Sequence, residues 1–261
     1  MGVLEVVFLG IVQGVTEFFP VSSSGHLLIL PQLFGWQQNS LAFDAMLHFG
    51  TTIAILFYFR RELTRIIKGF FLPKNLNDST FGWKLLLSTL PAIIVASVFK
   101  DSIETVFRNP SIVAVSLFVW AIGLLIADRI KNDKPRDMKD LSFVDALFIG
   151  CAQAVALVPG TSRSGITIIA GITRKLSREQ AVIYSFFMGI PVLLGASMIS
   201  LFDLVRLGDP HIQSFGMIFL ALLVTFFSGL FAIHFLLRFV KKGALTYFAI
   251  YRILLAILLI L

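Results

Sequence analysis

Two short polar segments interrupt long apolar stretches of the sequence and hold most of its chemically useful side chains. The first segment consists of Ser22, Ser23, Ser24, Gly25 and His26, and the second of Thr161, Ser162, Arg163, Ser164 and Gly165. A serine or threonine just before a helix is a good N-cap, and the free N–H groups at that helix end bind anions. An arginine guanidinium matches phosphate oxygens in bidentate fashion. We therefore expect two polar turns whose N–H groups, hydroxyls and guanidinium bind one anion.

Two further polar side chains precede the first segment. Glu17 follows Gln13 by about one helical turn, so both side chains project from one helix face. A carboxylate inside an apolar stretch is a functional candidate, and the alternative interpretation is a structural partner for Arg163. His26 is a candidate general acid, general base or nucleophile, and Ser23 is a second candidate nucleophile.

The sequence gives weaker reasons for a catalytic role of the remaining histidines. Asp44 and His48 have the same i, i+4 spacing, but we favour the interpretation that Asp44 lies at the outer membrane interface over that of a catalytic pair. His211 and His234 do not belong to a polar segment of this kind, and we assign them no role.

The composition places all these residues in a membrane protein. Of 261 residues, 57% are hydrophobic and 14% are charged, and the mean hydropathy is +0.90. A soluble domain carries about a quarter charged residues. A cytosolic globular enzyme, a disordered tail and a nucleic-acid module are therefore excluded. Cys151 is the only cysteine, which excludes an intrachain disulfide.

Six apolar stretches are candidates to cross a bilayer, whose core needs about 20 helical residues. They are residues 41–59, 85–99, 110–127, 180–202, 215–237 and 244–261. Two other apolar regions, 3–34 and 143–173, contain the polar segments, and their return pieces are too short to span. We predict that both are re-entrant hairpins, because irregular polar backbone at that depth must line a protein cavity. Helix packing would explain the serines alone, but an arginine there needs an anionic partner.

The two hairpins are related by an internal repeat. With a shift of 140 residues, identical residues fall on one another at seven positions. These positions are Phe8, Gly10, Gln13, Val15, Ser22, Ser24 and Gly25, which match Phe148, Gly150, Gln153, Val155, Ser162, Ser164 and Gly165. Each half then consists of one hairpin and three spans.

Lysine and arginine positions orient these halves. Seventeen of them lie within 60–84, 129–139, 174–178 and 238–242, against three in the opposite connections. The basic connections are expected to be cytoplasmic. The first hairpin then enters from the outer side and the second from the inner side, so the halves are inverted. We predict an all-α integral membrane protein with a first repeat at 1–128, a basic linker at 129–139 and a second repeat at 140–261.

The string from Gln13 to His26, Gln-Gly-Val-Thr-Glu-Phe-Phe-Pro-Val-Ser-Ser-Ser-Gly-His, resembles the motif of the undecaprenyl-diphosphatase family, the bacitracin-resistance proteins. The segment from Pro159 to Gly165, Pro-Gly-Thr-Ser-Arg-Ser-Gly, resembles the family's second motif. The resemblance extends over the whole chain in length and span order. It implies hydrolysis of undecaprenyl pyrophosphate to undecaprenyl phosphate, which recycles the lipid carrier of bacterial cell-wall synthesis. It also implies a plasma-membrane protein whose site opens to the outer side.

By the same resemblance, Glu17, His26 and Arg163 match catalytic positions, and residues 22–24 and 162–164 match phosphate-binding turns. Gln13 occupies the first acidic position of a Glu-x-x-x-Glu pattern, a variant that the motif allows. A Mg²⁺ or Ca²⁺ ion held by Glu17 and Gln13 is one expectation, and activation of the nucleophile by Glu17 without a metal is the other.

The expected partners are a polyprenyl pyrophosphate lipid and the bilayer, with no nucleic acid, and a homodimer is compatible with the sequence. The rival interpretation is a transporter or flippase for a phosphate-bearing lipid or anion, because inverted repeats with broken helices are typical of transporters. Glu17 and His26 favour the enzyme, since a pure anion carrier has no need of a carboxylate beside its substrate.

Overall fold

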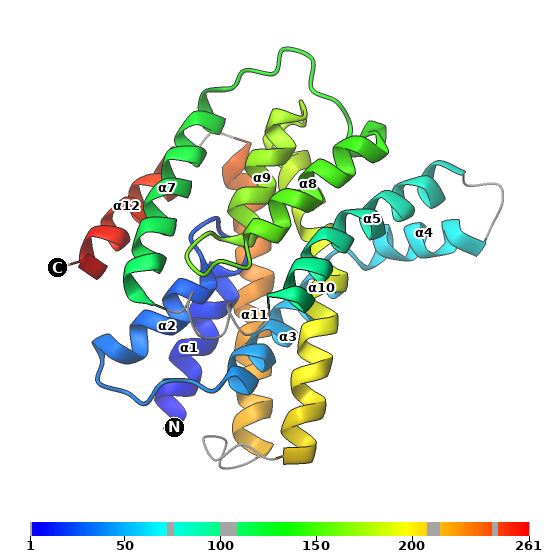
Figure 1. The fold of residues 1–261 in the computed structure, drawn as a ribbon. Helices are drawn as coiled ribbons and strands as arrows, with labels where there is room; N and C mark the ends of the chain where they lie inside the picture. The colour runs from blue at the N-terminus through cyan, green and yellow to red at the C-terminus, as the bar shows by residue number, and fades with distance from the viewer. Residues whose placement is uncertain (1, 72–75, 100–108, 208–214, 242–244, 261) are drawn as a thin grey trace.

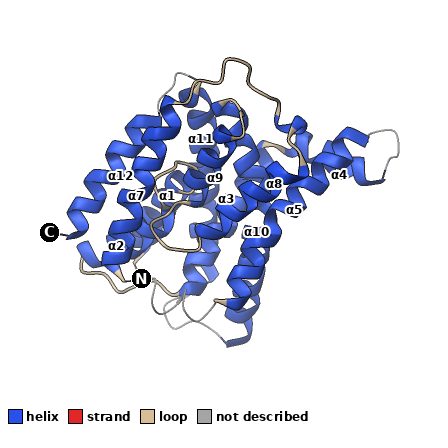
Figure 2. Ribbon diagram, turned by 45° about the horizontal axis from the view of Figure 1, so that its top comes forward, coloured by secondary structure: helices blue, strands red, loops and turns tan. Residues whose placement is uncertain are grey.

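A computed structural model describes residues 2–71, 76–99, 109–207, 215–241 and 245–260 of the chain. These ranges are helical and contain no strand, only one isolated bridge between Arg136 and Leu176 (Figures 1 and 2). The elements are α1 (Val3–Thr16), α2 (Ser23–Leu33), α3 (Leu41–Tyr58), α4 (Arg60–Phe71), α5 (Leu76–Val98), α7 (Pro110–Arg129), η1 (Met138–Asp140), α8 (Phe143–Val155), α9 (Arg163–Thr173), α10 (Arg178–Leu207), α11 (Phe215–Val240) and α12 (Leu245–Ile260).

Four of the described helices are long and apolar enough to cross a membrane, namely α5, α7, α10 and α11. Helix α3 reaches that standard only together with α4, to which it is bent by 82°, and α12 is a shorter apolar helix. The predicted spans 41–59 and 244–261 therefore correspond to helices α3 and α12, but neither of these helices alone is long and apolar enough to be counted among the four candidate spans. The chain is an all-helical, multi-pass membrane protein.

Both polar segments interrupt a pair of helices, as the sequence predicts. Helix α1 ends at Thr16 and α2 begins at Ser23, while α8 ends at Val155 and α9 begins at Arg163. Helices α2 and α9 have 11 residues each. At 1.5 Å per residue each is about 16 Å long, half the thickness of a bilayer core.

Two features near the basic segment 60–84 differ from the prediction. Residues 60–71 form the amphipathic helix α4, which buries Ile66 and Gly69 against α5 and keeps its charged residues outside. Helix α5 begins well before residue 85, because its early polar residues find partners. Asp78 pairs with Arg65 and Lys139, and Lys84 donates to the Lys139 carbonyl. In Figure 1, α4 and the first part of α5 project from the helix bundle as an arm.

The helices pack in a pattern that relates the two halves of the chain. Helix α1 of the first hairpin packs mainly on α11, and α8 of the second hairpin packs mainly on α5. Helices α7 and α12 lie side by side, and α3 lies against α10 (Figure 1). When the first half is exchanged for the second, α1 becomes α8, α5 becomes α11, and the pairs α3–α10 and α7–α12 are preserved. Each hairpin is thus held by a long helix of the opposite half.

Basic residues from four parts of the chain come together at one end of the molecule. Lys139 pairs with Asp78, the Arg136 N–H donates to the Lys175 carbonyl, and Lys241 pairs with Glu179. The segments 60–71, 76–84, 129–139, 174–178 and 238–241 therefore share this end, where acidic side chains such as Asp78 and Glu179 partly neutralise them.

Candidate active site

The two hairpin turns have the same local geometry. Ser22 and Ser162 have φ angles of 74° and 70°, a left-handed region that residues with a side chain rarely adopt. Such strain costs roughly 1–3 kcal/mol per residue. Each serine is the N-cap of the next helix, and its hydroxyl accepts a hydrogen bond from the N–H of Gly25 (3.3 Å) or Gly165 (3.1 Å). The caps offset part of the strain, and the turns aim the first residue of each short helix inward.

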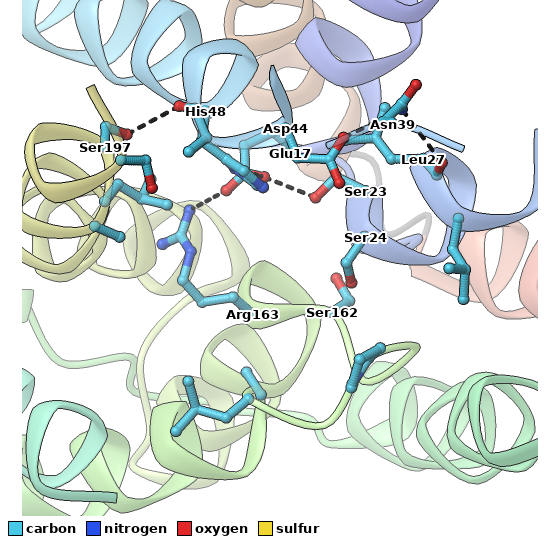
Figure 3. Close-up of a pocket in the computed structure, with 18 of the residues that line it drawn as sticks. Glu17, Ser23, Ser24, Leu27, Asn39, Asp44, His48, Ser162, Arg163 and Ser197 are labelled. Atoms are coloured by element: carbon cyan, nitrogen blue, oxygen red, sulfur yellow. Dashed lines mark hydrogen bonds and ion pairs between the residues drawn. The ribbon is translucent and has the colours of Figure 1, made fainter. Parts of the chain in front are cut away.

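Those two first residues reach one carboxylate. Ser23 begins α2 and Arg163 begins α9, and they occupy equivalent positions of the repeat. The Ser23 Oγ donates to Glu17 Oε2 at 2.7 Å, and Arg163 Nη2 donates to Glu17 Oε1 at 3.0 Å. Glu17 lies at the end of α1 and is only 5% exposed. The two hairpins, far apart in sequence, therefore meet at the carboxylate predicted from sequence (Figure 3).

The same carboxylate has two more neighbours. His48 Nδ1 of α3 lies 3.1 Å from Glu17 Oε2, and Gln13 Nε2 donates to that oxygen at 3.2 Å. Gln13 Nε2 also lies 2.9 Å from His48 Nδ1. The sequence pattern did not favour a catalytic role for His48, which nevertheless lies in this site. The feature that could have identified it is its i, i+4 spacing from Asp44, whose side chain lines the same cavity.

Arg163 is fixed from the other side by α10. Its Nη1 donates to the Ser185 carbonyl at 2.9 Å. A Cβ built on Gly189, one turn later, would overlap the Arg163 guanidinium. The guanidinium therefore lies directly against the α10 backbone, in space that only a glycine leaves open. Arg163 Nε is buried and has no hydrogen-bond partner among the described residues.

These side chains line a cavity of about 440 Å³. From the predicted site, Glu17, Ser23, Ser24, Ser162 and Arg163 contribute to its walls, and Ser24 and Ser162 face one another from the two hairpins (Figure 3). The polar wall continues through His48, Asp44, Asn39, Gln38, Ser197 and Ser200. Apolar side chains from the same parts of the chain complete the lining, namely Leu27, Leu28, Ala156, Leu157, Pro159, Leu193 and Ala196. A cavity of this kind suits a molecule with an anionic head and an apolar body.

His26 lies elsewhere. Its Nδ1 is 2.7 Å from the Ser22 carbonyl, its Nε2 is 2.6 Å from the Tyr251 hydroxyl, and its ring stacks on the Tyr251 ring. It does not belong to the cavity wall, because it lies on the face of α2 that meets α12. The predicted acid, base or nucleophilic role of His26 thus gains no support from this arrangement and stays a prediction.

The other predicted phosphate ligands lie behind the turns. The Thr161 Oγ1 is 2.9 Å from Ser116 Oγ of α7, and Ser164 Oγ donates to the Phe19 carbonyl at 3.2 Å. Ser22, Gly25 and Gly165 are buried within the caps described above. These residues shape the two turns and join them to neighbouring elements, whereas Ser24 and Ser162 present their side chains to the cavity.

The predicted shared cation does not fit the Gln13 and Glu17 side chains as they lie. Gln13 directs its amide nitrogen toward Glu17, and donors occupy both Glu17 oxygens. Hard cations need several oxygen ligands. Within the described ranges, no group of three or more His, Cys, Asp and Glu side chains is arranged to hold a metal ion. We therefore derive no step through a metal.

Comparison with known proteins identifies relatives over the whole chain. The sequence model of the family described as "Bacitracin resistance protein BacA" matches residues 6–258. "Undecaprenyl-diphosphatase 2" of Stutzerimonas stutzeri is 40% identical over 268 residues, which cover 100% of this chain and 98% of the relative. "Undecaprenyl-diphosphatase" of Moorella thermoacetica is 38% identical over 262 residues, with 100% and 97% covered. "Undecaprenyl-diphosphatase 1" of Pseudoalteromonas translucida is 38% identical over 263 residues, with 98% and 97% covered.

Proposed function

The chain belongs to the bacitracin resistance protein BacA family, and from this premise we propose that it hydrolyses undecaprenyl pyrophosphate to undecaprenyl phosphate and inorganic phosphate. This reaction recycles the lipid carrier of cell-wall synthesis and gives resistance to bacitracin. The observation that carries the proposal is the meeting of Ser23, Arg163 and Glu17 in a cavity lined by both polar and apolar side chains. A pyrophosphate on a polyprenyl chain has the matching chemistry.

Arg163 and the helix N-termini of the two turns bind the pyrophosphate. The hydroxyls of Ser24 and Ser162 are donors that line the cavity wall beside it. Phosphoryl transfer depends mainly on positioning and on neutralising charge, and preorganised donors supply both. The Glu17 carboxylate is tolerated beside a phosphate because Arg163 lies between them and pairs with it.

Ser23 is the nucleophile in this mechanism. Its Oγ attacks the terminal phosphorus and passes its proton to the Glu17 carboxylate, which already accepts that hydrogen bond at 2.7 Å. The phosphoanhydride bond breaks, and undecaprenyl phosphate leaves with the proton that Glu17 took from Ser23. Water then attacks the phosphoserine and gives a proton to Glu17, which passes it to the Ser23 oxygen as the P–O bond to serine breaks and inorganic phosphate is released. His48 and Gln13 keep the Glu17 carboxylate oriented toward Ser23.

The membrane arrangement is part of the proposal. The two halves, 1–128 and 140–261, form an inverted repeat of one re-entrant hairpin and three spans each, joined by the basic linker 129–139. Support comes from the exchangeable helix packing and the identical turns. The shared basic end faces the cytoplasm of a bacterial inner membrane. Helix α10 runs from that end to Ser200 at the cavity, so the cavity opens to the outer side.

The polyprenyl chain lies along the apolar side chains of the cavity lining and continues into the lipid, so only the head group must enter the protein. An inverted-repeat carrier for a lipid phosphate would also use two such turns. The short hydrogen bond from Ser23 to Glu17 favours the enzyme, because a carrier gains nothing from a serine poised against a buried carboxylate.

The test is release of inorganic phosphate from a long-chain prenyl pyrophosphate by the purified chain in detergent, where there is no membrane to cross. The enzyme releases phosphate and a pure carrier does not. Ser23→Ala should abolish turnover and Ser23→Cys should retain a trace of it. The matched control is Ser97→Ala, which removes an exposed serine of α5 that bonds only its own helix. Full activity of Ser23→Ala would refute the assignment of the nucleophile.

A further inference from the structure

Arg252 of α12 is a fully buried arginine that the mechanism above does not use. It is 0% exposed and is among the largest fully buried side chains of the molecule. It forms no ion pair with any residue in the ranges that the structure describes. A buried cation without a counter-charge is strongly unfavourable unless it makes many hydrogen bonds or faces an anion. Its presence in the interior therefore needs a specific reason.

The guanidinium makes its hydrogen bonds with backbone carbonyls only. Nη1 donates to the Pro20 carbonyl at 3.2 Å, and Nη2 donates to the Gly160 carbonyl at 2.8 Å. Pro20 lies in the first hairpin turn and Gly160 in the second, on opposite halves of the chain. Two further bonds reach α7, from Nε to the Leu117 carbonyl (3.2 Å) and from Nη2 to the Ser116 carbonyl (3.5 Å). One side chain thus joins both turns to the same helix.

The contacts around Gly160 and Gly165 show how close this junction is to the site. Gly160 has a φ of +89°, and a Cβ there would come within 2.5 Å of the Val113 carbonyl of α7. A Cβ on Gly165 would lie 3.4 Å from Arg252 Nη1. Gly165 belongs to the N-terminal turn of α9, whose first residues, Ser162 and Arg163, line the cavity. The positive charge of Arg252 therefore lies directly behind that turn, outside the cavity.

We propose that Arg252 is a positioning residue for the hydrolysis. By holding the carbonyls of Pro20 and Gly160, its guanidinium sets the spacing of the two turns and so the approach of Ser23 to a phosphate bound by Arg163. This role requires the planar guanidinium of arginine, whose N–H donors point in several directions. The single ammonium group of a lysine cannot reach carbonyls on two turns and on α7 together. This inference rests on the proposed function for its kinetics but not for its geometry.

The kinetic test compares Arg252→Lys, Arg252→Gln and wild type in detergent, per folded molecule as judged by gel filtration and below the unfolding midpoint of each variant. Arg252→Lys retains the charge and Arg252→Gln retains a planar donor. We expect kcat to fall at least tenfold in both, while KM changes less than threefold, because the cavity wall itself is intact. The control is Arg238→Lys, which changes an exposed arginine at the end of α11 and should leave both constants unchanged.

A second test reads the spacing of the turns without any turnover. Ser24→Cys and Ser162→Cys, together in a Cys151→Ser background, place one thiol on each hairpin across the cavity. Bifunctional thiol reagents of increasing length report the distance between them. With Arg252 in place, one length should be strongly preferred. With Arg252→Lys, that preference should weaken several-fold.

These measurements separate the two ideas. Absence of phosphate release from wild type would refute the proposed function and leave the cross-linking test standing. Unchanged kcat in a folded Arg252→Lys protein, or an unchanged preference among the cross-linkers, would overturn the positioning role. Failure of both Arg252 variants to fold would also overturn it, since the residue would then be required for folding alone.

Discussion

Replacing Gly189 by alanine should disable the site from a helix that contributes no proposed catalytic group. The new methyl group would occupy the position of the Arg163 guanidinium, so the arginine has to move. Two interactions are then at risk, the 2.9 Å bond from Nη1 to the Ser185 carbonyl and the 3.0 Å ion pair of Nη2 with Glu17. A hydrogen bond to a charged group contributes roughly 1.5–3 kcal/mol. Loss of one such interaction in the transition state predicts a fall in kcat/KM of roughly tenfold to 150-fold.

The assay is phosphate release from a long-chain prenyl pyrophosphate in detergent. Gly195→Ala on the same helix is the matched control, because its Cβ would meet no atom within 4 Å. Both substitutions raise helix propensity by about 1 kcal/mol, so the control accounts for any general stiffening of α10. Gly195→Ala should have wild-type kcat/KM.

A double-mutant cycle identifies the cause. If Gly189→Ala acts by displacing the guanidinium, it should cost little in an Arg163→Lys background, where no guanidinium remains to displace. The two effects should then be clearly non-additive. Wild-type activity of Gly189→Ala, or strictly additive effects, would refute the claim that α10 positions Arg163.

Three further predictions concern other parts of the site and its orientation. His48→Ala removes a hydrogen-bond partner of Glu17 and should lower kcat/KM by roughly two- to tenfold, whereas His48→Gln restores an amide donor and should recover most of the rate. Equal losses in both variants would contradict a role limited to orienting Glu17. Gln13→Glu exchanges a donor beside Glu17 for a second carboxylate, so the variant should bind Mg²⁺ or Ca²⁺ in a direct binding titration more tightly than wild type, and equal binding by both proteins would contradict the poor fit of a cation to the wild-type side chains. In a Cys151→Ser background, Asn39→Cys should react with a membrane-impermeant thiol reagent in intact cells and Asn132→Cys only after permeabilisation; reaction of both from one side would contradict the inverted arrangement.

The sequence was sufficient for the two helical breaks and for the candidate groups of the site. Glycine-bearing polar turns inside long apolar stretches are local features, and both turns separate two helices as predicted. A carboxylate and an arginine in an apolar medium both need partners, which marked Glu17 and Arg163 as candidates. The repeat places Ser23 and Arg163 at equivalent helix starts, but the contact of both with Glu17 is a result of the fold.

Other features depend on which faces of the helices meet, and the sequence pattern does not contain that information. The sequence favoured His26 over His48, because His26 lies in the longest motif. Residues of a short helix point in all directions, and the packing of α12 against α7 takes His26 to Tyr251, while α3 brings His48 to Glu17. Local spacing cannot distinguish these outcomes, because the partners of His26 and His48 come from distant parts of the chain.

Arg252 and Gly189 illustrate the same limit. An arginine in the apolar stretch 244–261 is visible in the sequence as an anomaly, but its ligands are backbone carbonyls, which every residue has and no motif marks. Gly189 of α10 matters because it leaves room for the Arg163 guanidinium, which comes from the second hairpin turn. The sequence determined the chemistry by placing rare polar groups in an apolar chain. The tertiary structure alone decided which of those groups share the cavity, because the close approach of helices far apart in sequence sets every distance between them.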